Sequence, residues 1–333
     1  MKVGAARRRS TAPGLSAYIT RRLLYLGPTW LGLSLLAFLL GNVAPGDPAR
    51  AYFQRTQGRP PSPEELAVFR ARNNLDGSLA ERFANWVVDA LQGDLGRSFS
   101  TGRPVTEELL SRFPTTLQLA SAAMVVALVI AIPVGIVAAL FRNRLADQAL
   151  RIGSMLGASL PSFFLAYVLI IVFSVKLGWL PAIGRGEPKQ IIMPALALGL
   201  GDSAVLARLM RSSLLEVMGE NWVRAARARG VPRWKVVLRH GVGNSLGAVI
   251  TEAALTFGFL LAFSAIVEVI FVWPGIGRLV LEAITQRDYP VIQGFVLFAG
   301  TVFVVLNLAV DIVYGRLDPR VTVGATGGGV RPA

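Results

Sequence analysis

The chain contains no cysteine and a single histidine, His240. Without cysteine there is no disulfide, no thiolate zinc site and no thiol catalysis, and one histidine gives little basis for a histidine metal site or a triad. Charged residues make up only 16% of the 333 residues, whereas soluble globular domains carry about 25%. The deficit lies in long charge-free runs, which indicate a membrane protein rather than a soluble protein with a large core.

A further absence concerns nucleotide binding. The sequence has no G-x-x-x-x-G-K-[ST] motif, so this chain is not expected to cradle ATP phosphates by that device. The net charge is +14, yet the lysines and arginines lie mostly in short segments between apolar runs, which suits orientation in a membrane better than binding to nucleic acid. We therefore predict no catalytic residue, no bound metal or cofactor, and no nucleic-acid partner.

Six apolar runs are long enough for helices that cross a bilayer, which takes about 20 residues. They place the expected spans at about 23–44, 117–141, 152–175, 190–209, 247–272 and 290–314. The first run follows Arg21 and Arg22 as a signal peptide would, but it is charge-free for 24 residues, and the apolar region of a signal peptide has about 7–15. We interpret it as an uncleaved first helix of an all-α integral membrane protein.

The distribution of lysine and arginine predicts the orientation of these spans. Six basic residues precede the first span, three lie in 142–151 and eight in 208–239, against three in 176–190 and two in 274–289. Because short cytoplasmic loops are enriched in basic residues, we expect both tails, 1–22 and 315–333, on the cytoplasmic side of a bacterial inner membrane. The second tail ends in a glycine-rich stretch that we expect to be disordered.

The long segment 45–116 is then extracytoplasmic, and two helices are expected within it. The sequence SPEE at 62–65 is typical of a helix start, with proline at the first position and acids in the first turn. The stretch 79–91 has apolar residues near helical spacing, Trp86 among them, which favours a small helix lying on the outer membrane surface.

The cytoplasmic segment 212–245 is the most informative part of the chain. It is basic and amphipathic, and Gly230 separates two helical pieces. Small residues leave a surface on which another chain could dock closely, and cations offer contacts to an acidic partner or to lipid phosphates; the small residues are Ala225, Ala226 and Ala228, and the cations are Arg224, Arg227, Arg229, Arg233, Lys235 and Arg239. A docking element and a basic loop resting on anionic lipid are equally good interpretations of the composition.

The stretch RAARARG at 224–230 resembles the E-A-A-x-x-x-G loop of ABC importer permeases. Ala225, Ala226 and Gly230 match that pattern, whereas Arg224 replaces the acid and the later I-x-L-P portion is not matched. Longer stretches resemble the peptide-importer branch in order: RRLLYLGPTWLGLSLLAFLLGNVAPGDPA, GDLGRSFSTGRPVTEELLSRFPTTLQLA, LPSFFLAYVLIIVFSVKLGWLPAIG, FVWPGIGRLVLEAITQRDYPVIQG and NLAVDIVYGRLDPRV. Over about 21–321 the chain is similar to the first of two permease subunits of dipeptide, oligopeptide or nickel importers.

This resemblance implies the type I ABC importer permease fold over 113–314, with the EAA-like loop as a cytoplasmic coupling helix. The residues that it assigns to ATPase coupling are Arg224, Ala225, Ala226, Ala228 and Gly230. It implies as partners a second homologous permease, two ATPase subunits that use ATP and Mg, an extracytoplasmic substrate-binding protein and membrane lipid. Peptides, nickel chelates, glutathione-like molecules and some sugars are all plausible substrates, since the binding protein largely sets specificity.

Three acids, Asp202, Glu252 and Glu268, lie within the expected spans. An ionisable residue inside a membrane span is a candidate for the transport pathway or a gate. Glu252 and Glu268 lie near the two ends of the fifth span, where pairing or snorkelling at the headgroups is the alternative. Asp202 could instead reach the cations Arg208 and Arg211.

Two other function classes fit the sequence less well. A secondary transporter or channel driven by an ion gradient would show chains of intramembrane charge and paired broken helices in two halves, and no half-to-half symmetry is visible. A membrane enzyme would need a polar cluster, and His240 has no convincing partner. The leading prediction is a permease subunit of an ATP-driven importer.

Overall fold

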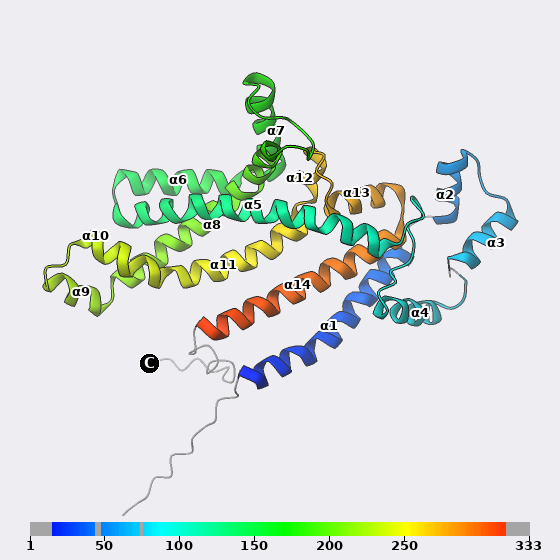
Figure 1. Cartoon of the computed structure of the whole chain (residues 1–333), viewed down its shortest axis with the longest axis horizontal. Coiled ribbons are helices and arrows are strands. Elements are labelled where there is room, and N and C mark those ends of the chain that lie inside the picture. The colour runs from blue at the N-terminus through cyan, green and yellow to red at the C-terminus, as the bar shows by residue number, and fades with distance from the viewer. Residues whose placement is uncertain (1–14, 44–47, 74–75, 318–333) are drawn as a thin grey trace, which may run out of the picture.

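The computed structural model describes residues 15–43, 48–73 and 76–317, and these are mostly helical (Figure 1). The glycine-rich stretch and most of the two predicted tails lie outside the described residues. The long helices are α1 (Leu15–Val43), α5 (Val105–Leu140), α8 (Ile192–Met218), α11 (Val242–Phe263) and α14 (Tyr289–Leu317). The shorter ones are α2 (Pro48–Gln57), α3 (Pro63–Arg72), α4 (Leu79–Leu91), α6 (Leu145–Ser159), α7 (Ser162–Leu169), α9 (Asn221–Ala228), α10 (Arg233–Val236), α12 (Ala265–Ile270) and α13 (Ile276–Gln286).

Four helical stretches among the described residues are long and apolar enough to cross a membrane: Val105–Leu140, Pro188–Met218, Trp234–Phe263 and Tyr289–Ala309. The pair Asp147–Gly157 and Ser162–Lys176, bent by 98°, makes a fifth if it is counted as one span. Helix α1 has a shorter apolar stretch, Leu26–Gly41. The protein is an all-helical membrane protein with four or five candidate spans. The predicted total of six crossings, which needs α1 as a further span, stays a prediction.

The third expected span, 152–175, is not one straight helix. Helix α6 ends at Ser159, and α7 begins at Ser162, directly after Pro161. Proline has no N–H to donate and disfavours the helical conformation of the residue before it, and Leu160 accordingly has a ψ of 121°. The prediction of a single helix was wrong, because the proline ends one helix and starts another.

The fifth expected span, 247–272, is also divided. Helix α11 ends at Phe263, and Glu268 belongs to the short helix α12. The interpretation that placed Glu252 and Glu268 on one helix was therefore wrong. The expected second and fourth spans are confirmed as helices but are longer than predicted, since α5 begins at Val105 and α8 continues to Met218.

Close contacts at glycines show how the central helices run. Gly199 of α8 lies against Ala123 and Val126 of α5, and Gly135 of α5 lies against Met210 of α8. Because the contacting residues advance together along both helices, α5 and α8 are parallel. The buried face of α5 is rich in alanine, and small residues of this kind let helices in a membrane approach closely.

The first and last long helices lie side by side (Figure 1). Gly41 of α1 faces Gln293 of α14, while Leu33 faces Gly300. These contacts run in opposite directions along the two helices, so α1 and α14 are antiparallel. The start of α1 and the end of α14 therefore lie at the same end of the bundle.

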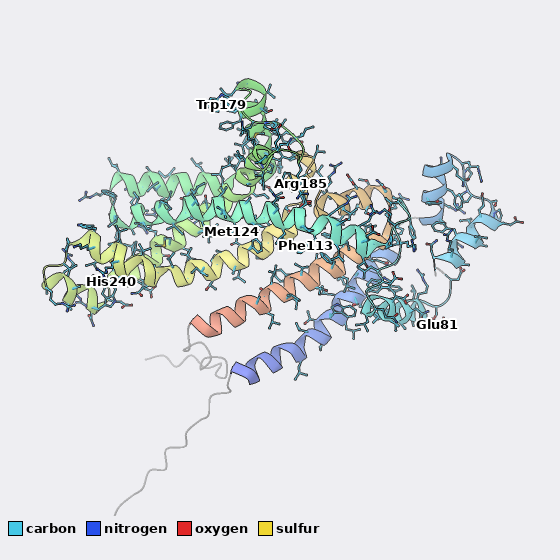
Figure 2. All side chains as sticks on the ribbon, in the orientation of Figure 1. Glu81, Phe113, Met124, Trp179, Arg185 and His240 are labelled. Carbon is cyan, nitrogen blue, oxygen red and sulfur yellow. The ribbon has the colours of Figure 1, made fainter. Side chains whose placement is uncertain are left out.

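Helices α2, α3 and α4 lie at one end of the bundle, which we call the outer end, and α9 and α10 lie at the other, the hairpin end (Figure 1). Glu81 of α4 and His240 mark these two ends in Figure 2. Both expected helices of the outer end are confirmed. Ser62 and Ser78 cap α3 and α4, each in a reciprocal capping box with the glutamate three residues later.

Candidate functional site

The basic segment between α8 and α11 forms a helical hairpin that turns at Gly230. Gly230 has a φ of +80°, in the left-handed region that favours glycine. Its N–H donates to the carbonyl of Arg227 (2.9 Å), and the N–H of Val231 donates to the carbonyl of Ala226 (3.2 Å). These two bonds are the Schellman pattern that closes the C-terminus of a helix. Gly230 thus separates the two helical pieces, as the sequence predicted, and it does so in a left-handed conformation.

No close neighbour within the chain explains the glycine at position 230. No atom outside its chain neighbours lies within 4 Å of the position that a Cβ would take. Within the chain, the requirement for glycine therefore comes from the backbone conformation and not from a close approach of another segment.

The hairpin has a small hydrophobic core of its own. Val223 and Ala226 of α9 are buried against Val236 of α10, with Val231 packed alongside. Ala226 is therefore turned toward its own chain, and the expectation that it belongs to the surface offered to another protein needs correction. Ala225 lies on the exposed side of α9.

The exposed side of the hairpin combines cations with apolar groups. Ala225, Ala228, Arg224, Arg227, Arg229, Lys235 and Arg239 are all exposed. Trp234 and Leu238 are 59% and 57% exposed. Exposed arginine and tryptophan side chains are typical of surfaces that bind a protein partner.

Glu268 is held in the interior of the outer end. Its side chain is fully buried, and its carboxylate accepts hydrogen bonds from the Thr116 hydroxyl (2.7 Å), the Ser264 hydroxyl (3.0 Å) and the N–H of Arg278 (2.9 Å). Arg278 lies in the first turn of α13, so the carboxylate caps the positive end of that helix. Glu268 therefore joins α5, α12 and α13, and its hydrogen bonds give it an architectural role.

Asp202 and Glu252 differ from Glu268 in having no ion pair or side-chain hydrogen bond among the described residues. Both are half-buried, Asp202 on α8 and Glu252 on α11. The alternative, a contact of Asp202 with Arg208 or Arg211, is not present: no ion pair joins Asp202 to either, and Arg211 forms a two-bond ion pair with Asp147 of α6, at 2.7 and 2.8 Å. Asp202 and Glu252 stay candidates for the pathway.

Asp288, just before α14, is a buried acid that the sequence patterns did not single out. It is 1% exposed and accepts hydrogen bonds from the Ser98 hydroxyl (2.6 Å) and the N–H groups of Phe99 (3.0 Å) and Ser100 (2.9 Å). It thereby ties the loop before α5 to the turn between α13 and α14. No local signal in the sequence marks these contacts, because the Asp288 side chain binds a loop 188 to 190 residues earlier and not the start of α14.

No group of three or more potential metal-ligating side chains occurs in the part of the chain that the structure describes. The buried acids accept hydrogen bonds from hydroxyls, backbone N–H groups or arginine.

Two family models and several relatives match the chain. Residues 131–323 match the model described as "Binding-protein-dependent transport system inner membrane component", and residues 15–120 match the model of its N-terminal part. The glutathione transport system permease proteins GsiC of Escherichia coli (strain K12) and of Salmonella typhi are each 41% identical to it over 304 residues. The matches cover 91% of this chain and 98% of each relative.

Among solved structures, two crystal forms of the inward-facing MetNI methionine ABC transporter match with TM-scores of 0.53 and 0.54. Each is 20% identical, and the match covers 63% of this chain and 96% of the other. This likeness concerns the fold. With the family models and the relatives, it shows that the chain belongs to the family of binding-protein-dependent transport system inner membrane components: it is a permease subunit of an ABC importer, which works with a separate ATPase and a substrate-binding protein.

Proposed function

We propose that this chain pairs with a second, homologous permease and that the pair forms the pathway for peptides or a closely related small solute. The relatives at 41% identity are permeases for glutathione, which is itself a small peptide, and this supports a peptide-like substrate. The half-buried acids Asp202 and Glu252 support a pathway that accepts solutes with an amino group, because neither acid has a partner within the described residues.

The proposed topology has six crossings with both tails in the cytoplasm. The antiparallel contact of α1 with α14 supports it, since the start of α1 and the end of α14 lie at one end of the bundle. That end also carries the basic hairpin, as expected for the cytoplasmic side. In this topology α1 and the bent pair of α6 and α7 are the two crossings that composition alone marks less clearly.

The hairpin of α9 and α10 is, in this proposal, the element that docks on an ATPase and couples ATP hydrolysis to transport. The observation that carries the proposal is that α9 has one side buried within the hairpin and one side exposed. The apolar residues of α9 close an internal core, while Ala225, Ala228 and the arginines point outward. A rigid turn with its own core can transmit a movement of the ATPase to α8 and α11, because the hairpin connects these two helices directly.

The coupling proposal is tested with Ala225→Asp and Ala228→Asp in the complete transporter. Both alanines are exposed, so the chain should keep its abundance and unfolding temperature. A carboxylate buried without a partner at an interface costs about 2 kcal/mol or more, which corresponds to roughly thirtyfold weaker retention of the ATPases and a large loss of transport.

Ala67→Asp is the matched control, because Ala67 is an exposed alanine of the outer helix α3 and should tolerate the change. Ala226→Asp is unsuitable as a docking test, since a charge there would disrupt the internal core of the hairpin. If both docking variants transport and retain the ATPases as the wild type does, the hairpin is not the coupling element.

Substrate and energy source are tested by uptake of labelled glutathione and labelled peptides into cells that express the whole importer. Uptake should disappear when the ATPase genes are removed. Uptake that continues without them would support the alternative of a transporter driven by an ion gradient.

The topology is tested by cysteine labelling at exposed positions. Ala67→Cys and Thr285→Cys should react with an impermeant reagent in intact cells, and Ala228→Cys only after permeabilisation. Gly275 is unsuitable as a probe, because a side chain there would overlap with the carboxylate of Glu268. The reverse labelling pattern would invert the proposed topology.

A further inference from the structure

The loop before α8, residues 177–187, is fixed against the end of α12. The N–H of Gly184 donates to the carbonyl of Phe271, the residue that follows α12, at 3.0 Å. The side-chain amide of Gln190 makes hydrogen bonds with three backbone groups of the same loop. The loop therefore presents the next side chain, that of Arg185, from a defined backbone position.

The guanidinium group of Arg185 is held from two sides. Its Nη2 donates to the side-chain oxygen of Gln118 on α5 at 3.0 Å, and its central carbon lies 5.8 Å from the centre of the Trp273 ring. Trp273 is itself fixed, because it is 1% exposed and its indole N–H donates to the carbonyl of Thr115 at 3.0 Å. Figure 2 shows Arg185 near α12. A cation held in this way loses little conformational freedom when it binds a ligand.

This guanidinium group has no acid to neutralise it. No carboxylate in the described part of the chain lies within ion-pair distance of Arg185, the carboxylate of nearby Glu187 included. Arg185 and Gln118 are both exposed, and the amide nitrogen of Gln118 has no hydrogen-bond partner among the described residues. The pair therefore offers several N–H donors to an acceptor from outside the chain, and an anion is the acceptor that a guanidinium group binds most strongly.

The exposed side of α5 is polar where it meets Arg185 and apolar further along. Gln118 and Ser121 are exposed, and Val125 and Val129 continue the same side of the helix as exposed apolar residues. An amide turned toward hydrocarbon would lack hydrogen bonds, so the start of this side contacts water or a polar ligand. Under the proposed topology, this is the outer mouth of the pathway.

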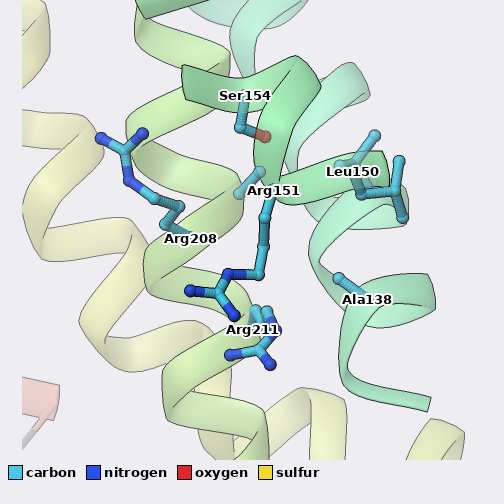
Figure 3. Close-up of a pocket in the computed structure, with 8 residues that line it drawn as sticks. Ala138, Leu150, Arg151, Ser154, Arg208 and Arg211 are labelled. Carbon is cyan, nitrogen blue, oxygen red and sulfur yellow. The ribbon is translucent and has the colours of Figure 1, made fainter. Parts of the chain in front are cut away.

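The cations at the hairpin end do not form a comparable site. Arg151, Arg208 and Arg211 line an open cleft between α6 and α8, but their guanidinium groups point to different places (Figure 3). Arg211 is also paired with Asp147. Arg185 differs from them because a hydrogen bond and a ring contact together fix the position of its remaining donors.

We propose that Arg185 and Gln118 form a subsite for a carboxylate of the transported solute at the outer mouth of the pathway. The guanidinium group pairs with both carboxylate oxygens, while the amide of Gln118 orients the guanidinium group and adds a further donor. This inference rests on the proposed function, and it adds a group of opposite charge to the acids Asp202 and Glu252. A peptide with free termini carries one partner for each kind of group.

The test uses the complete purified transporter without its binding protein, so that only the membrane complex selects the ligand. The transporter is placed in phosphatidylcholine nanodiscs, and equilibrium dialysis measures the binding of labelled trialanine and of labelled trialanine amide, which lacks the carboxylate. Trialanine should bind roughly tenfold more tightly than the amide, as expected for a charge-assisted pair. Arg185→Gln should remove this difference by weakening the binding of trialanine alone.

Three further variants separate a binding role from a structural one. Gln118→Glu supplies a carboxylate from the chain itself and should abolish the difference although Arg185 is still present. Arg185→Lys keeps the charge and should retain part of the difference. Lys189→Gln is the matched control, because it removes an exposed charge just after the same loop and should change nothing. A general folding defect would weaken the binding of both peptides equally.

Equal binding of the two peptides by the wild type, including binding of neither, would overturn the proposal. So would a difference that persists in Arg185→Gln, or an equal weakening of both peptides in that variant. Loss of the difference when phosphatidylglycerol is added to the nanodiscs would assign the site to lipid headgroups instead. Failure of the proposed function is recognised separately, as a lack of ATPase-dependent peptide uptake by the wild-type importer.

Discussion

The two ends of the bundle differ in how their charged side chains are paired and buried. At the outer end, Glu108, Glu268 and Asp288 are buried, and they accept hydrogen bonds from hydroxyls or backbone N–H groups. At the hairpin end, the buried acid Asp147 is already paired with Arg211, and many further cations are exposed. The buried acids of the outer end thus have their partners within the chain, whereas the hairpin end has exposed cations without buried acids to pair with.

This difference separates structural acids from surfaces meant for other molecules. A buried carboxylate without a cation is tolerated only when oriented dipoles and hydroxyls surround it, so the outer-end acids fix the relative positions of several segments. The exposed arginines of the hairpin end have no such role within the chain. The comparison predicts that changes at the buried acids of the outer end reduce stability, and that changes on the exposed side of the hairpin end reduce interaction with partners.

The largest expected effect is that of Glu268→Ala. It leaves the Thr116 hydroxyl and the N–H of Arg278 without their partner in a buried site, at a cost of about 3 kcal/mol. For a chain of 333 residues that corresponds to an unfolding midpoint lower by about 4 °C. The measurement is thermal unfolding of the purified transporter.

Glu282→Ala is the control for this prediction. Glu282 of α13 forms partly exposed ion pairs with Arg278 and Arg112, which contribute about 1 kcal/mol or less. Equal destabilisation by Glu268→Ala and Glu282→Ala would contradict the structural role of Glu268.

A smaller effect is expected for Asp288→Ala. The loop residues Ser98, Phe99 and Ser100 lose a shared acceptor, which costs about 2 kcal/mol and acts mostly on the loop. Hydrogen exchange should therefore increase at 98–101 more than in α14. Ser98→Ala removes one of the three bonds and should give an intermediate increase; protection that persists in Asp288→Ala would show that the loop is held by other contacts.

Local chemistry in the sequence was enough to predict some elements closely. The bounds of α4 were predicted from apolar spacing, and the start of α3 from a proline at the first helical position followed by acids in the first turn; the structure adds the serine caps. The turn at Gly230 follows from glycine between two helical patterns. Each of these features is decided within a few residues, and for that reason one sequence reveals it.

The buried acids depend on contacts that no local pattern contains. Thr116, which donates to Glu268, is 152 residues away in the sequence, and Ser98 is 190 residues from Asp288. The inward position of Ala226 was accessible in principle, because Val223 and Ala226 are three residues apart and thus share a face of α9. The small size that Ala225, Ala226 and Ala228 share does not reveal this difference, whereas the spacing does.

A third prediction concerns the turn of the hairpin. Gly230→Val forces a β-branched residue into a left-handed conformation and should destabilise the hairpin by about 1–2 kcal/mol, whereas Gly230→Asn should be tolerated better because asparagine adopts this conformation more readily. ATPase-coupled transport is the measurement, with unfolding of the whole transporter little changed. Equal activity of Gly230→Val and Gly230→Asn would show that the positive φ is not required.

The smallest expected effect is electrostatic and lies at the exposed start of α3. The carboxylate of Glu65 accepts hydrogen bonds from Arg59 at 2.5 and 2.8 Å and from the N–H of Ser62 at 2.7 Å, which lowers its pKa from 4.5 to about 2. The unfolded segment therefore takes up the proton first as the pH falls. The contribution of Glu65 to the stability of α3 is complete above about pH 4.5 and is lost as the pH falls through about 2.

Arg59→Gln should raise the pKa of Glu65 toward its ordinary value, as measured by NMR titration of the carboxyl carbon, while Arg72→Gln at the other end of α3 should leave it unchanged. An unchanged pKa in Arg59→Gln would mean that the Ser62 N–H alone sets it.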